Sequence, residues 1–152
     1  KCYFLESPRY SLTQDDTYKA LDRLQEFIDR YPNSENLREA NNMVLELLNK
    51  LQHKSFEIAR GYDKIRDYQA AIKAFDNFLI DNPGSNFRED AMYYRLHSAY
   101  ELAKNSIKQK EKQRFEEAKG YYETFIRVYP ESSYKEKATK MYQDIIKKIS
   151  EL

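Results

Sequence analysis

Apolar residues in this chain recur at the spacing of one face of an α-helix, and the same pattern appears three times. Each copy has an alanine, a large apolar residue four positions later, a phenylalanine three positions further on and a proline five positions after that. The three copies are Ala20, Leu24, Phe27 and Pro32; Ala71, Phe75, Phe78 and Pro83; and Ala118, Tyr122, Phe125 and Pro130. The apolar positions share one side of a helix with about 3.6 residues per turn, and proline cannot continue a helix. The pattern therefore predicts three helices, each with an apolar face and each ending just before its proline.

The residues after each proline predict that a new helix begins at once. A serine stands two positions past every proline of the pattern, and a small polar residue is then followed three positions later by a glutamate. These polar pairs are Asn36 with Glu39, Asn86 with Glu89 and Ser133 with Glu136. Side chains of this kind can accept hydrogen bonds from the free amides at a helix start, so each pair is typical of an N-terminal cap.

The alternation of helices, with an alanine, an aromatic residue and then a proline at these distances, is typical of the tetratricopeptide repeat (TPR). In such proteins stacked helix pairs share one continuous core. We therefore expect an all-α fold, a TPR-like helical-repeat solenoid of about seven antiparallel helices. A fold of this kind favours a binding scaffold over a catalyst.

The repeats are longer than the standard length of about 34 residues, because successive prolines of the pattern are 51 and 47 residues apart. The excess of the middle repeat precedes Ile58, so we expect a single long helix from about Leu37 to about Lys64. Most of the excess of the last repeat is polar, and we expect it to form a polar connection around Ser106 to Gln113.

The sequence predicts one domain over residues 1–152. Its parts are a partial repeat (1–34), a repeat with a long first helix (35–85), a repeat with a polar insertion (86–132) and a capping helix (133–152). The segment from Cys2 to Leu5 looks like the end of a helix whose beginning is missing. We therefore expect the chain to be a piece of a longer protein, in which an export signal or a lipid anchor would precede these residues.

The charge balance and the residues that carry chemistry argue against an enzyme. The chain has 26 basic and 25 acidic residues, and its net charge of +1 gives no field that would attract nucleic acid. The only histidines are His53 and His97, too few ligands for a zinc site. Gly61, Gly84 and Gly120 stand alone, so no phosphate-binding loop can be assembled. We expect no catalytic residue, no cofactor and no metal.

Tyrosine and arginine are the residues that best mark a possible partner surface, because both are enriched in binding hot spots. Several of them cluster in the last two repeats. We take as candidate partner-binding residues Arg88, Tyr93, Tyr94, Arg95, Arg127, Tyr129 and Tyr134.

A second candidate surface is a run of basic residues within the polar insertion. Its members are Lys104, Lys108, Lys110, Lys112 and Arg114, with Glu111 as the one acidic residue among them. The run could face an acidic partner or lipid headgroups, although a solvated loop explains it more simply.

Several longer phrases of the sequence resemble the BamD family of outer-membrane assembly lipoproteins, in particular its Bacteroidetes branch. They are SPRYSLTQ at 7–14, FIDRYP at 27–32, YQAAI at 68–72, YELAKNS at 100–106 and YYETFI at 121–126. The resemblance covers essentially the whole chain, and the long helix and the polar insertion match that family's departures from standard repeats. Thr13 departs from the aspartate expected in the first phrase.

The resemblance implies a non-catalytic scaffold of the machinery that assembles β-barrel proteins, at the periplasmic face of the outer membrane. It implies docking on the periplasmic (POTRA) domains of the barrel-forming subunit BamA, and contact with other BAM subunits and with unfolded outer-membrane proteins. It also implies that the membrane is reached only through an N-terminal lipid anchor, and that no nucleic acid is bound.

Two alternatives stay open. A YbgF-like periplasmic TPR protein that coordinates envelope constriction shares the phrase with alanine, phenylalanine and proline, but its repeats hold closer to standard length. The chain could also be another TPR module for protein–protein interaction. A clamp for a C-terminal carboxylate is excluded because its Lys and Asn positions hold Phe56, Arg60, Tyr94 and Ser98 here.

Overall fold

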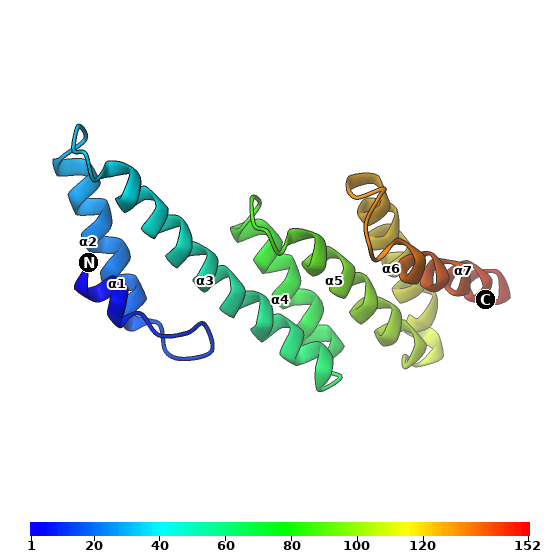
Figure 1. Ribbon diagram of the computed structural model, residues 1–152. Coiled ribbons are helices and arrows are strands. Elements are labelled where there is room, and N and C mark those ends of the chain that lie inside the picture. Colours follow the sequence, from blue (N-terminus) through cyan, green and yellow to red (C-terminus); the bar gives the residue numbers. More distant parts are fainter. The chain divides into compact units, whose positions relative to one another are not determined.

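The computed structural model describes residues 1–152 and consists of seven α-helices without a strand (Figure 1). The helices are α1 (Cys2–Glu6), α2 (Asp15–Arg30), α3 (Leu37–Lys64), α4 (Tyr68–Asp81), α5 (Arg88–Lys104), α6 (Lys108–Val128) and α7 (Lys135–Glu151). Neighbouring helices in the chain pack on one another, as in α4 with α5 and α5 with α6. The predicted all-α class with seven helices is confirmed.

The helix ends follow from local sequence signals. The long helix α3 spans Leu37–Lys64, so its predicted bounds are confirmed. The three helices with the alanine pattern end at Arg30, Asp81 and Val128, each two residues before its proline. Proline lacks an amide proton and restricts the residue before it, so the chain leaves the helix at that point.

The serine two positions after each proline organises the same turn three times. The hydroxyls of Ser34, Ser85 and Ser132 accept hydrogen bonds from the amides of Asn36, Phe87 and Tyr134, at 3.2, 3.1 and 3.1 Å. The carbonyl oxygens of the same serines accept bonds from the amide three residues later. This repeated turn reverses the chain direction between the paired helices.

The predicted caps at two helix starts are wrong. Helix α5 begins at Arg88 and α7 at Lys135, with Phe87 and Tyr134 in the cap positions and no side-chain cap bond. In both turns the cap residue is the one whose amide binds the serine hydroxyl, two positions after the serine. Asn86 and Ser133 stand one position earlier, so each helix begins one residue later than its polar pair suggested.

The predicted polar connection around Ser106 to Gln113 is also wrong for most of its length. Helix α6 begins at Lys108, and only residues 105–107 join it to α5. The inserted residues are mainly Lys, Gln and Glu, which are good helix formers, and include neither Gly nor Pro. The insertion therefore lengthens α6. Lys108, Lys110, Lys112 and Arg114 of the basic run lie on its first turns, and Lys104 ends α5.

The chain divides into two compact units, Lys1–Ser55 and Phe56–Leu152, called here unit 1 and unit 2. Helix α3 contributes residues to both. Unit 1 has a small core in which Ala20 and Leu24 of α2 pack with Ala40 and Leu47 of α3. The loop between α1 and α2 is joined to α3 by Lys50, whose ammonium donates a hydrogen bond to the hydroxyl of Ser7 at 2.8 Å. The expectation of one domain stays a prediction.

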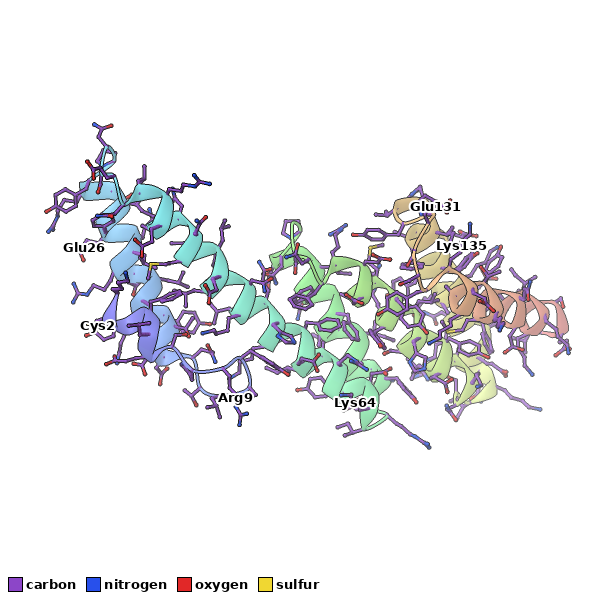
Figure 2. All side chains as sticks on the ribbon, viewed as in Figure 1. Cys2, Arg9, Glu26, Lys64, Glu131 and Lys135 are labelled. Carbon is purple, nitrogen blue, oxygen red and sulfur yellow. The ribbon has the colours of Figure 1, made fainter.

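Unit 2 has a larger core that is rich in aromatic side chains, which fill the space between its helices (Figure 2). Phe56 of α3 lies 6.1 Å from Phe75 of α4 and 6.2 Å from Tyr94 of α5, measured between ring centroids. Phe115 and Phe125 of α6 are fully buried in the same core. These contacts hold the part of α3 from Phe56 onward together with α4, α5 and α6.

Candidate partner-binding surface

The turn between α4 and α5 and the turn between α6 and α7 lie at the same end of unit 2 (Figure 1). Two hydrogen bonds tie them together: the hydroxyl of Ser132 donates to the carboxylate of Glu89, and the hydroxyl of Tyr134 donates to that of Asp90. We call this end of unit 2 the two-turn end. It places Glu131, labelled in Figure 2, and the neighbouring residues of α6 in solvent.

Three of the predicted partner-binding residues belong to the two-turn end. Arg88 begins α5 and is half-buried, and Arg127 in the last turn of α6 is exposed. Tyr129 is half-buried, with its ring 6.1 Å from that of Phe125. Between them Val128 leaves an apolar side chain exposed. The surface therefore combines arginine, tyrosine and an aliphatic residue.

Three other predicted residues form an aromatic cluster beneath this surface. Tyr93 is only 8% exposed, and its ring stacks on that of Tyr134 with centroids 4.1 Å apart and an interplanar angle of 10°. Tyr94 meets Tyr93 edge to face at 5.1 Å and carries the guanidinium of Arg60 over its other side at 4.5 Å. Burial raises the pKa of both Tyr93 and Tyr134 above the usual range, and for Tyr134 the bond to Asp90 adds to that rise. These rings pack mainly on one another.

Arg95 lies apart from the arginines of the two-turn end. Its guanidinium forms a 2.7 Å ion pair with Asp76 of α4 and lies 4.3 Å from the ring centroid of Tyr121 of α6. The side chain is 14% exposed. Arg95 therefore joins three helices of unit 2, and the structure does not bring it together with Arg127.

A polar network around Asp63 was not predicted from the sequence. The carboxylate of Asp63 in α3 accepts a bond of 2.9 Å from Nδ1 of His97 and one of 2.7 Å from the hydroxyl of Ser98, both in α5. The hydrogen bond to Asp63 raises the pKa of His97, and this outweighs the opposing effect of burial. Burial alone would raise the pKa of Asp63, but the bonds from His97 and Ser98 bring it below its usual value. The network joins α3 to α5 with a charged pair.

This network predicts a pH dependence of folding. Because the folded pKa of His97 lies above its unfolded value of about 6.5, the stabilisation is complete below that pH and is lost as pH rises through the folded pKa. The Asp63 contribution has the opposite sense and is lost as pH falls through its lowered pKa. Urea unfolding between about pH 5.5 and 8.5 is expected to show stability falling on the alkaline side. His97→Gln should flatten that slope, and an equally steep slope in this variant would refute the assignment.

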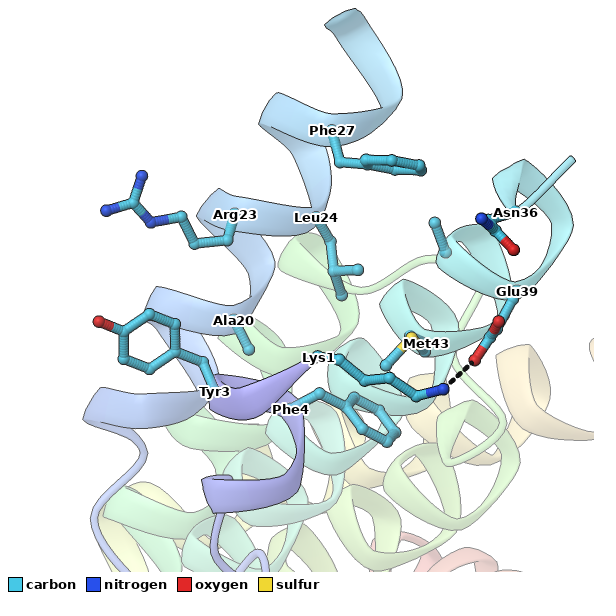
Figure 3. Close-up of a pocket in the computed structure, with 11 residues that line it drawn as sticks. Lys1, Tyr3, Phe4, Ala20, Arg23, Leu24, Phe27, Asn36, Glu39 and Met43 are labelled. Carbon is cyan, nitrogen blue, oxygen red and sulfur yellow. Dashed lines mark ion pairs between the residues drawn. The ribbon is translucent and has the colours of Figure 1, made fainter. Parts of the chain in front are cut away.

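Unit 1 contains a separate pocket of about 330 Å³ between α1, α2 and α3 (Figure 3). Phe4, Leu24, Phe27 and Met43 give it an apolar lining, as Figure 3 shows. At its rim the ammonium of Lys1 forms a 3.0 Å ion pair with Glu39. The pocket can hold an apolar side chain. The sequence pattern assigned Leu24 and Phe27 only to the core, so the sequence did not predict this pocket.

The fold and these surfaces define a class of protein, the helical-repeat proteins that bind partners through packed helix pairs. The chain matches the YfiO family, described as an outer membrane lipoprotein, over residues 4–75 and 64–151. Together these ranges cover nearly the whole chain, which therefore belongs to the YfiO family, also called BamD. The resemblance seen in the sequence phrases is confirmed.

The family consists of outer-membrane lipoproteins that are implicated in the assembly of outer-membrane proteins and act without catalysis. No curated protein matches the chain. None of the helices combines the length and the apolar character needed to cross a membrane.

Proposed function

We propose that this chain is a non-catalytic scaffold of the β-barrel assembly machinery at the periplasmic face of the outer membrane, lipid-anchored in the full-length protein. The observation that carries the proposal is the family match over residues 4–75 and 64–151. In this role the chain docks on the periplasmic POTRA domains of BamA and contacts other subunits of the complex. It changes no covalent bond.

The two-turn end of unit 2 is the docking surface that the geometry favours. Arg127 and Val128 are exposed there, and Arg88 and Tyr129 lie beside them. Arginine and tyrosine are enriched in binding hot spots, and an exposed aliphatic side chain between them adds apolar area. The bonds from Ser132 and Tyr134 hold the two turns in place before a partner arrives, which lowers the entropic cost of binding.

The pocket of unit 1 supports the other expected contact, with unfolded outer-membrane proteins. Its apolar lining, with Leu24 and Phe27 on one side and Met43 on the other, fits apolar side chains of an extended segment. The charged groups of Lys1 and Glu39 at the rim can form hydrogen bonds with the polar backbone of such a segment near the opening.

The docking proposal is tested by calorimetry with the POTRA domains of BamA from the same organism. We expect saturable binding, with a dissociation constant of about a micromolar or tighter. Arg127→Glu should weaken binding by about tenfold, because a reversed charge opposes the partner at the interface and slows association. The binding should also weaken as salt increases.

The matched control is Arg38→Glu, which makes the same charge change at an exposed position of unit 1. Equal weakening by both variants would mean that net charge alone matters, and would exclude the two-turn end as the docking site. No binding by the folded chain would contradict the docking proposal itself.

A further inference from the structure

The end of unit 2 opposite to the two-turn end carries a surface that the proposed docking does not use. It is formed by the turn between α3 and α4 and the turn between α5 and α6, which lie at one end of the unit (Figure 1). Figure 2 labels Lys64 there, at the end of α3. We call this surface the basic end. Its members are Lys64, Ile65, Arg66, Lys104, Ile107, Lys108, Lys110 and Lys112.

The basic end combines exposed aliphatic side chains with a concentrated positive charge. Ile65 is 72% exposed and Ile107 is 61% exposed, one in each turn. Six basic residues surround them, against Asp67, Glu111 and Glu101, the last of which pairs with Lys104 at 3.4 Å. In a chain with a net charge of +1, this end is therefore strongly positive.

The first turn departs from what helix termini normally require. The amides of Arg66 and Asp67 bond to the carbonyls of Asp63 and Tyr62, so that Arg66 occupies the position where a helix end usually has glycine. Its φ of 63° lies in the left-handed region, which is unfavourable for a residue with a Cβ. Glycine would fit this turn better, yet the chain places an arginine there.

The start of α6 departs from the usual pattern in a similar way. Ile107 occupies the cap position without a side-chain cap bond, and Lys108 and Lys110 lie in the first turn, with Glu111 as its one acidic residue. A helix start favours Ser, Thr, Asp or Asn at the cap and acidic residues after it, because free amides make it positive. Helix α2, by contrast, has Asp15 and Asp16 in its first turn. Residues that oppose local preference at both turns indicate a functional requirement.

We propose that the basic end is a membrane-contact surface that binds anionic lipid headgroups, with Ile65 and Ile107 entering the interfacial layer. Lysine is depleted from protein–protein interfaces, whereas flexible lysines around exposed aliphatic residues suit a lipid surface, where apolar stems are buried and charges meet phosphates. Each basic residue near an anionic bilayer strengthens binding. This contact is additional to any lipid anchor and does not depend on docking to BamA.

The proposal is tested by co-sedimentation of the chain with vesicles of phosphatidylcholine that contain phosphatidylglycerol, with pure phosphatidylcholine vesicles for comparison. We expect binding to the anionic vesicles only, weakened by salt. The triple variant K108Q/K110Q/K112Q should bind about a hundredfold more weakly, because three cations are removed from the contact. I65S/I107S should lose about tenfold and keep the salt dependence.

A matched control removes three exposed lysines of α7, in the variant K135Q/K137Q/K147Q, with the same change in net charge. It is expected to bind like the unmodified chain, and circular dichroism should show the same helix content for all variants. If this control lost as much vesicle binding as the α6 variant, the binding would depend only on net charge and not on the basic end, and the proposal would be overturned. Absence of binding to anionic vesicles at low salt would also overturn it and would leave an acidic protein as the partner that fits this surface.

Discussion

Replacing Phe75 by alanine is expected to lower the free energy of unfolding of unit 2 by about 3–5 kcal/mol. Phe75 is fully buried, and its ring packs beside those of Phe56 in α3 and Tyr94 in α5, at 6.1 and 6.3 Å between centroids. Truncation removes apolar area from the core and leaves a cavity that three helices border. Because helical-repeat proteins are stabilised mainly by contacts between neighbouring helices, the loss should spread to α3, α4 and α5 together.

Urea denaturation followed by circular dichroism measures this effect. Ile80→Ala is the matched control, because Ile80 lies on the same helix with its side chain 75% exposed. We expect the control to change stability by less than about 0.5 kcal/mol. A loss below about 1 kcal/mol in Phe75→Ala would contradict the packing described for α4, since Phe-to-alanine changes in a core cost several times more.

Replacing Tyr134 by alanine is expected to cost about 2–4 kcal/mol, mainly by loosening α7. Its ring stacks on Tyr93, its hydroxyl donates to Asp90, and its carbonyl accepts the amide of Ala138 at the start of α7. The alanine variant keeps the backbone bond but removes both side-chain contacts. Amide hydrogen exchange should therefore show the largest loss of protection in α7 and in the first turns of α5.

Tyr134→Phe separates the two contributions. It keeps the stack on Tyr93 and removes only the hydroxyl, so the expected cost is about 1 kcal/mol. If the phenylalanine variant were as unstable as the alanine variant, the hydrogen bond to Asp90 would carry the effect and the stacking would not. If neither variant changed stability, the role assigned to the cluster of Tyr93, Tyr94 and Tyr134 would be wrong.

These two stability tests also bear on the docking surface. The sequence predicts Tyr93 and Tyr134 as partner-binding residues, and the structure places them largely in contact with each other. A binding defect in a Tyr134 variant could therefore reflect a displaced α7. Arg127, which is exposed, reports on binding more directly.

The sequence by itself determined the helical class, the number of helices and most of their ends. The alanine pattern predicted the buried faces of α2, α4 and α6, and the excess residues before Ile58 predicted the length of α3. These features depend on periodicity, proline and helix propensity, which act over a few residues. The two errors, at the caps and at the start of α6, lie where two local preferences compete: the serine turn against the polar cap residue, and helix propensity against the polar composition of the insertion.

Only the tertiary structure decided which polar and aromatic side chains meet. Asp63 pairs with His97, Arg95 with Asp76 and Tyr100 with Asp144, over separations of 34, 19 and 44 residues. Likewise, no local signal distinguishes the buried Tyr93 from the exposed Arg127, or brings Ile65 and Ile107 to one end. The angle and register at which helices pack decide these contacts, and they arise from the fit of whole helix faces, which a pattern of single residues does not contain.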